Sequence, residues 1–192
     1  MERIRLTLPL SAEQAASLRA GDLLLLNGYL FTARDAAHKK MIAALDRGES
    51  LPIDLAGQTI YYAGPCPGRP GQAVGSAGPT TSGRMDAYTP RLLQLGLRAM
   101  IGKGARSSAV HEAIRQNGAV YLGATGGAGA LLAQCICTAE VVAYPELGTE
   151  AIRRLQVEDF PVVVLYDIQG GDLYEIGRRQ YDQSITQSLS ET

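Results

Sequence analysis

Short apolar runs alternate with amphipathic segments in the middle third of the sequence, and this alternation constrains the fold more than any other feature. Apolar runs of strand length at 59–63, 99–101 and 119–122 are separated by helical patterns at 86–95 and 107–116. Strands that alternate with helices are typical of parallel crossover units, because parallel strands cannot be joined by a tight turn. The pattern therefore predicts an α/β domain with parallel strands.

Both ends of the chain carry signals for antiparallel pairing. Asn27-Gly28 interrupts an apolar run at 23–32, and because this dipeptide tolerates positive φ angles we expect a hairpin there. Gly170-Gly171 is expected to turn a strand at 162–167 back onto Leu173-Tyr174. Terminal hairpins and central parallel units together predict a mixed sheet in a three-layer α/β fold.

Capping patterns and glycines suggest where the remaining helices begin and end. Ser11 with Gln14, and Thr32 with Asp35, have the spacing of capping boxes. The first helix is expected to end at Gly21 and the second before Gly48. The remaining expected elements are strands at 4–8 and 136–143, a helix at 130–134 and a helical piece at 149–155.

Composition bounds the class of protein. The chain has 192 residues and no linker that would divide it, so we expect one domain at 1–178 and a polar, frayed tail at 179–192. With 46% apolar residues, 19% charged residues and a net charge of −1, the sequence is not that of a disordered chain or a general nucleic-acid binder. No apolar run approaches the ~20 residues of a membrane span, and the first residues do not resemble a secretory signal.

The cysteines and histidines give only weak metal signals. Cys66, Cys135 and Cys137 are an odd number of cysteines, which does not suggest a disulfide framework and favours a reducing cytoplasm. Their spacing lacks the C-x-x-C pattern, so small core residues are the better interpretation than ligands of an iron–sulfur cluster. His38 and His111 belong to no zinc pattern.

A long connection rich in proline and glycine, 64–83, has no hydrophobic period. Structureless connections of this length in compact domains are usually functional or disordered, and the flanking strand and helix favour function. The segment Gly78-Pro79-Thr80-Thr81-Ser82-Gly83-Arg84-Met85-Asp86 places three hydroxyl groups and a guanidinium at the start of a helix, where free amides attract anions. A plain capping role for Thr81 or Ser82 is the alternative.

Two further cations stand at positions that suit an anion site. Arg34 lies in the first helical turn, where a cation opposes the helix dipole, and Lys103 lies between two glycines at the end of an apolar strand. Together with Arg84 they would form a site for a dianion, although each taken alone is more typical of a solvated surface. The glycine-rich segment 123–129 lacks G-x-G-x-x-G spacing and the lysine of a phosphate loop, so close packing or a simple anion-binding turn is the better interpretation.

Five motifs in a fixed order resemble one known family. They are Thr32-Ala33-Arg34-Asp35-Ala36-Ala37-His38, Tyr61-Tyr62-Ala63-Gly64-Pro65, the segment 78–86, Gly102-Lys103-Gly104 and Val157-Glu158-Asp159-Phe160-Pro161. Together they are similar to the β subunit, or C-terminal catalytic domain, of class I iron–sulfur fumarate hydratases and L(+)-tartrate dehydratases. The resemblance covers residues 5–177 and implies a swivelling β/β/α fold.

The resemblance also implies an activity and assigns roles. Members of the family are hydro-lyases of four-carbon dicarboxylates. By resemblance, Thr80 is the catalytic base, and Arg34, Arg84 and Lys103 bind substrate carboxylates. It further implies a [4Fe-4S] cluster held by a partner α subunit, with no metal ligand in this chain, and an aspartate of that partner as general acid.

Three functions remain open on sequence grounds. The first is the hydro-lyase β subunit, with fumarate as the preferred substrate and tartrate as the alternative. The second is a non-catalytic domain that binds a small anion without a partner. The third is a chain that assembles its own cluster from Cys66, Cys135 and Cys137.

Overall fold

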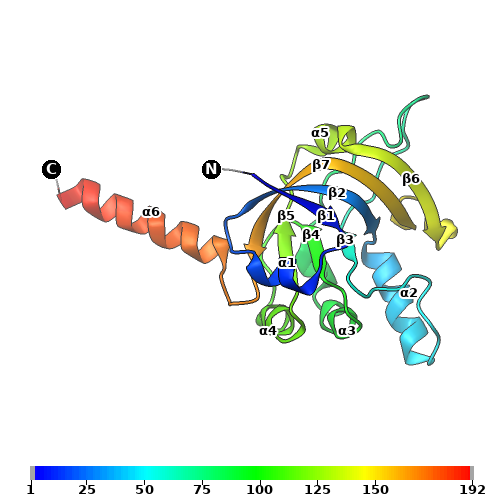
Figure 1. The fold of residues 1–192 in the computed structure, drawn as a ribbon, viewed down its shortest axis with the longest axis horizontal. Helices are drawn as coiled ribbons and strands as arrows, with labels where there is room; N and C mark the ends of the chain where they lie inside the picture. Colours follow the sequence, from blue (N-terminus) through cyan, green and yellow to red (C-terminus); the bar gives the residue numbers. More distant parts are fainter. Residues whose placement is uncertain (1–2, 191–192) are drawn as a thin grey trace.

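A computed structural model describes residues 3–190, with side chains as far as Asp182. Its seven strands form a single mixed sheet (Figure 1). The strands are β1 (Ile4–Leu8), β2 (Leu23–Thr32), β3 (Thr59–Tyr61), β4 (Ala99–Gly102), β5 (Val120–Gly123), β6 (Ile136–Ala143) and β7 (Ile152–Tyr166). The helices are α1 (Ala12–Ser17), α2 (Asp35–Asp46), α3 (Thr89–Gln94), α4 (Ser108–Asn117), α5 (Gly129–Gln134), α6 (Leu173–Ser190) and the 3-10 turns η1 (Ser82–Met85) and η2 (Pro145–Glu150).

The sheet closes on itself. Its strand order is β1-β2-β3-β4-β5-β7-β6, and β2 additionally pairs with β7, so that β2, β3, β4, β5 and β7 form a barrel-like ring. Strands β2 to β5 run parallel, whereas the long strand β7 runs antiparallel to β2, β5 and β6. The α/β class and the mixed sheet are therefore confirmed. The finer expectation of a swivelling three-layer domain stays a prediction.

Side chains of β3, β4 and β5 alternate between two apolar cores. Tyr61, Ile101 and Leu122 face a core shared with β1, β2 and β7. Met100 and Tyr121 face a second core, filled by α2, α3 and α4. Strands buried on both faces read as nearly continuous apolar runs, which is why these three were recognisable in the sequence.

Neither expected terminal hairpin forms. Asn27-Gly28 lies inside β2, where a bulge shifts the register against β7. Gly28 has a φ of 107°, and a Cβ there would lie 2.7 Å from the carbonyl oxygen of Leu8 on β1. The glycine therefore serves a bulge and a close strand approach instead of a turn.

At the other end of the chain, Asp172 makes a single antiparallel bridge to Tyr166, but no second strand follows. Asp172 Oδ1 accepts from the Tyr174 amide at 2.8 Å, and helix α6 begins at Leu173. In Figure 1, α6 projects away from the body of the molecule. Because it runs to Ser190, it crosses the expected boundary at residue 178, and the division into domain and tail stays a prediction. The end of that tail, 191–192, lies outside the described residues.

Helix boundaries differ from the sequence expectations in four places. Ser11 and Gln14 do form a reciprocal capping box, but α1 ends at Ser17, before Gly21. Thr32 does not cap α2: its N-cap is Arg34, and the Thr32 hydroxyl accepts from the Arg153 amide at 3.2 Å. The helix expected at 86–95 is shortened to α3, and η1 precedes the expected range. The piece expected at 149–155 becomes the end of η2 and the start of β7. Among the described residues, no helix is both long and apolar enough to cross a membrane.

Candidate active site

Four parallel strands bring the expected site residues to one edge of the sheet. The register pairs Thr32 with Tyr61, Tyr61 with Ile101, and Gly102 with Gly123, so β2, β3, β4 and β5 end side by side. Arg34 follows the end of β2, and Lys103 follows the end of β4 directly. The carboxyl ends of parallel strands are where α/β proteins most often bind ligands.

The loop that carries Thr80 lies across the ends of β3 and β4. The Thr80 amide donates to the carbonyl of Tyr62, directly after β3, at 2.8 Å. One residue on, Thr81 forms a parallel bridge with Lys103. The Ser82 amide then donates to the Lys103 carbonyl at 2.9 Å. The backbone therefore holds Thr80 and Lys103 at neighbouring strand ends.

The fully buried side chain of Ser82 holds this loop in place through hydrogen bonds. Its hydroxyl accepts from the Lys103 amide at 3.1 Å and lies 2.8 Å from the hydroxyl of Tyr121. The Tyr121 hydroxyl also lies 2.8 Å from the carbonyl oxygen of Gly104. The Tyr121 hydroxyl thus donates toward both the Ser82 hydroxyl oxygen and the Gly104 carbonyl oxygen, which share its single proton. Burial raises the pKa of Tyr121, which keeps its hydroxyl proton in place for this chain of bonds.

Arg34 and Arg84 meet on the carboxylate of Asp35. Arg84 Nε donates to Asp35 Oδ1 at 2.7 Å, and Arg34 Nη2 lies 3.6 Å from Asp35 Oδ2. Glu150 also approaches Arg34 Nη2, at 3.7 Å, and accepts from the Ala36 amide at 2.9 Å. Glu150 of the chain itself thus partly compensates the positive charge of Arg34 at the start of α2. A guanidinium has five N–H donors, so both arginines keep donors free for a ligand. Arg34 Nε is buried and has no hydrogen-bond partner among the described residues.

Lys103 extends its side chain over the end of β5. A Cβ at Gly126 would lie 3.7 Å from Lys103 Nζ, an ordinary contact distance, so the ammonium group lies directly beside this glycine. Lys103 also lines a cavity of about 190 Å³ together with Gly123, Ala124, Thr125, Val163, Leu165 and Tyr174. The glycine-rich segment thus leaves room for the lysine.

The same segment also packs closely against the long loop. A Cβ at Gly129 would lie 2.9 Å from the amide nitrogen of Gly78. The Ala77 amide donates to the Gly129 carbonyl at 3.0 Å. The glycines at the start of α5 therefore allow this close approach, in agreement with the packing interpretation.

A buried ion pair below the site was not expected from the sequence. Arg106 has a side chain without solvent exposure, and its Nε donates to Asp86 Oδ1 at 2.6 Å. Its guanidinium also bonds Thr89 and lies over the rings of Tyr62 and Tyr121. Asp86 is the last residue of the motif that begins at Gly78. An acidic residue directly after this mostly small-residue segment is the one sign of the pair in the sequence. The pair anchors η1, and with it Arg84.

His38 is the other buried polar group near Arg34. Its ring is fully buried, and Nδ1 lies 2.9 Å from the Arg34 carbonyl oxygen. Burial lowers the pKa of His38 to about 4, so the ring is neutral at pH 7. A neutral ring that donates from Nδ1 orders the first turn of α2.

The described residues contain no group of three or more His, Cys, Asp or Glu side chains that could hold a metal ion. Cys66 in the long loop and Cys137 on β6 are exposed, and Cys135, directly before β6, is only partly buried, so the interpretation of the cysteines as small core residues is wrong. Burial raises the pKa of the Cys135 thiol, which disfavours the thiolate that metal binding needs. The residues of this part of the chain therefore do not fit an iron–sulfur cluster.

Comparison with known proteins shows the family of the chain. The family model described as Fumarase C-terminus matches residues 1–177. The chain belongs to the Fumarase C-terminus family. It is 45% identical over 177 residues to a protein of Salmonella typhimurium named fumarate hydratase class I, aerobic. This match covers 90% of the chain and 30% of the relative.

Other members of the Fumarase C-terminus family differ in how much of them the chain spans. Fumarate hydratase 2 of Leishmania major is 43% identical over 165 residues, or 84% of this chain and 29% of that protein. The putative L(+)-tartrate dehydratase subunit beta of Methanocaldococcus jannaschii is 36% identical over 181 residues, or 91% of this chain and 93% of that protein. The chain thus spans about a third of the fumarate hydratases and nearly all of the tartrate dehydratase subunit. Both names describe hydro-lyases.

Proposed function

We propose that the chain is the β subunit of a [4Fe-4S]-dependent hydro-lyase that reversibly hydrates fumarate to L-malate in the cytoplasm. One observation carries the proposal. The loop that contains Thr80 is hydrogen-bonded to Lys103 at one edge of the sheet, and the Arg34–Asp35–Arg84 cluster lies at the same edge. The relatives named fumarate hydratase, 45% and 43% identical to the chain, support the choice of reaction.

The arginines would bind the substrate carboxylates. In the reaction, negative charge builds up on the carboxylate next to the carbon that gains or loses a proton, so fixed cations aimed at it lower the barrier most. Guanidinium groups bind carboxylates through two parallel N–H bonds. In our proposal Arg34 and Arg84 use the donors that Asp35 leaves free, and Asp35 keeps the two side chains in position.

Thr80 would transfer the proton. In the dehydration of malate its alkoxide takes the proton from the carbon beside a carboxylate, and the electron pair of that C–H bond becomes the second bond of the alkene. The hydroxyl group on the neighbouring carbon takes up a proton and leaves as water. A threonine hydroxyl is a poor base unless positive charge favours its alkoxide. In our proposal Lys103, whose backbone pairs with the next residue, Thr81, supplies that charge.

The cluster and the second half of the site would come from an α subunit. No group that could hold metal was found among the residues described, so we assign no step of this chain's chemistry to the cluster. The general acid that protonates the leaving hydroxyl is likewise expected on the partner. A separate β subunit is consistent with the tartrate dehydratase relative, of which this chain spans 93%.

That coverage also favours a second candidate, the dehydration of L(+)-tartrate to oxaloacetate. The reaction type and the carboxylate contacts would be the same. The two substrates differ in hydroxyl groups, whose contacts in our proposal lie largely on the partner.

The test is turnover by a reconstituted pair. The chain would be combined with a cluster-loaded α subunit of the class I type, and fumarate, L-malate and both tartrate stereoisomers would be assayed. We expect interconversion of fumarate and malate, faster than any reaction of tartrate. Preferred turnover of L(+)-tartrate would establish the second candidate. No turnover by an assembled pair, with dicarboxylate binding by the isolated chain, would instead establish an anion-binding domain.

A further inference from the structure

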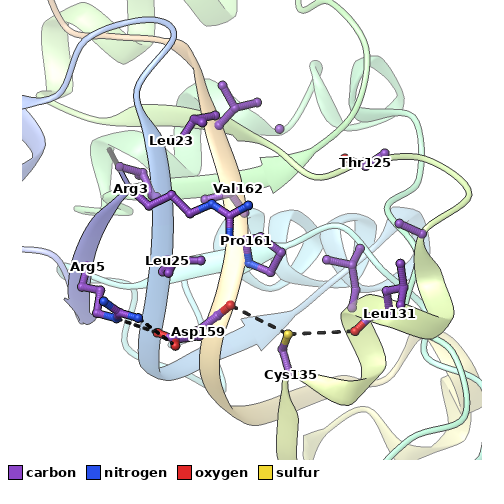
Figure 2. A pocket seen from close by; sticks show the side chains of 15 residues that line it. Arg3, Arg5, Leu23, Leu25, Thr125, Leu131, Cys135, Asp159, Pro161 and Val162 are labelled. Carbon is purple, nitrogen blue, oxygen red and sulfur yellow. Dashed lines mark hydrogen bonds and ion pairs between the residues drawn. The ribbon is translucent and has the colours of Figure 1, made fainter. Parts of the chain in front are cut away.

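A groove of about 680 Å³ lies between the start of β1, the start of β2, the middle of β7 and helix α5 (Figure 2). Its lining is predominantly apolar. We call it the leucine groove and define it by Leu23, Leu25, Leu131, Leu132, Pro161 and Val162.

Leu131 is an exposed apolar residue of the groove. It stands on α5 with 65% of its surface exposed, whereas its neighbour Leu132 is buried in the core. A single exposed leucine needs no explanation, but one that forms the wall of an apolar groove favours contact with another molecule.

Two arginines lie at the rim of the groove, and they differ in whether a carboxylate compensates their charge. Arg5 is bonded to Asp159 through Nε at 3.2 Å and Nη2 at 3.3 Å, so its charge is compensated. Arg3 reaches across the groove toward Val162 and Pro161 (Figure 2), and no carboxylate among residues 3–182 pairs with it. The groove therefore offers one free positive charge beside an apolar floor, which suits a partner surface that combines apolar side chains with a carboxylate.

The groove is continuous with the candidate active site. Gly123, Thr125 and Val163 line both the leucine groove and the smaller cavity that contains Lys103. A molecule seated in the groove would thus also border the lysine.

The relatives indicate what occupies this position. The match to the Salmonella typhimurium fumarate hydratase covers only 30% of that protein, and the family is named for the C-terminus, so most of that relative precedes the matched part. The preceding part therefore connects at the end of the domain that carries Arg3 and Arg5 in this chain, and both arginines line the groove. In that relative a large polypeptide is therefore tethered beside this groove.

We propose that the leucine groove is the docking surface for the α-type partner, which would cover Leu131 with apolar side chains and pair a carboxylate with Arg3. The inference rests on the proposed function, because that function calls for the partner. It goes beyond it by naming the surface. Neither Leu131 nor Arg3 belongs to the catalytic machinery proposed above.

The test measures assembly instead of turnover. Binding of the chain to the α subunit would be followed by calorimetry and light scattering for wild type, Leu131→Glu and Arg3→Glu. Val141→Glu, at a 45% exposed position on β6 outside the groove, and Arg69→Glu, in the long loop, are the matched controls. We expect each groove variant to weaken binding by at least roughly tenfold, and each control to stay within about twofold.

Because Leu131 and Arg3 are exposed, the variants should keep the wild-type circular dichroism spectrum, which separates lost binding from lost folding. Groove variants that bind as tightly as wild type would overturn the proposal, as would a wild-type chain that does not associate with the α subunit. So would a self-associated chain whose dimer the same variants disrupt, since a second copy would then occupy the groove. If the pair assembles through the groove but turns over no dicarboxylate, the proposed function fails and the docking surface stands.

Discussion

The buried His38 should make the stability of the folded chain depend on pH between about 4 and 6.5. Its ring has no solvent exposure, and Nδ1 donates to the Arg34 carbonyl oxygen at 2.9 Å. Nε2 has no hydrogen-bond partner among the described residues. Protonation would place a second N–H, and a charge, among the rings of Tyr62 and Tyr88. Burial therefore lowers the pKa of His38 from 6.5 to about 4.

The sign and size of the effect follow from this shift. The unfolded chain binds a proton at His38 below pH 6.5, whereas the folded chain does not until about pH 4, so stability is complete above pH 6.5 and is lost as pH falls toward 4. A shift of this size amounts to about 3 kcal/mol at about 1.4 kcal/mol per pH unit.

Urea denaturation between about pH 7 and about pH 4.5 would measure this loss. His38→Gln removes the titrating group, so its free energy of unfolding should lose roughly 2.5 kcal/mol less over this range than that of wild type. His111 is the only other histidine, and its side chain is 30% exposed, so His111→Gln is the matched control and should follow wild type. Parallel pH profiles for wild type and His38→Gln would refute the reasoning.

Three further predictions concern the site and its support. Arg84→Lys keeps the charge but loses the planar fork, so in the reconstituted pair the KM for fumarate should rise about tenfold or more, and a change below twofold would count against the carboxylate contact. Gly102→Ala would place a methyl group 1.9 Å from a buried serine hydroxyl and should lower the thermal midpoint by the equivalent of about 1–3 kcal/mol, whereas Gly177→Ala, in open space on α6, should be neutral or slightly stabilising. Arg106→Met leaves Asp86 without its cation and should cost about 3–5 kcal/mol in urea denaturation, unless both are replaced together, when the cost should be smaller than the sum.

The sequence predicts best those strands whose burial is visible in their own residues. β4 and β5 begin and end within about one residue of the apolar runs, because strands buried in a parallel sheet need apolar side chains on both faces. The first part of β7 was read as helical because its side chains alternate in burial only through pairing with β2 and β6. Asn27-Gly28 misled for the same reason. Gly28 does have a positive φ angle, but it lies in a bulge because β2 pairs there with a strand distant in the sequence.

The candidate site divides in the same way. The residues expected from the 78–86 motif lie at strand ends, as the alternation of strands and helices predicts. Their supporting contacts join positions far apart in the chain: Arg34 with Glu150, Ser82 with Tyr121 and Asp86 with Arg106. No local pattern specifies such pairs. A tyrosine in an otherwise apolar strand was the one visible sign of the bond to Ser82.

The central claim is that this chain supplies the base and the carboxylate contacts of a hydro-lyase site. Turnover of L-malate by the reconstituted pair, compared between wild type and Thr80→Ala, tests it most directly. Thr138→Ala, at an exposed position on β6, serves as the matched control, and Thr80→Ser as the variant that keeps a hydroxyl. The account predicts that kcat falls roughly a hundredfold to ten-thousandfold for Thr80→Ala, with partial recovery in Thr80→Ser and no loss in the control. A Thr80→Ala pair that turns over malate within about twofold of wild type would contradict it.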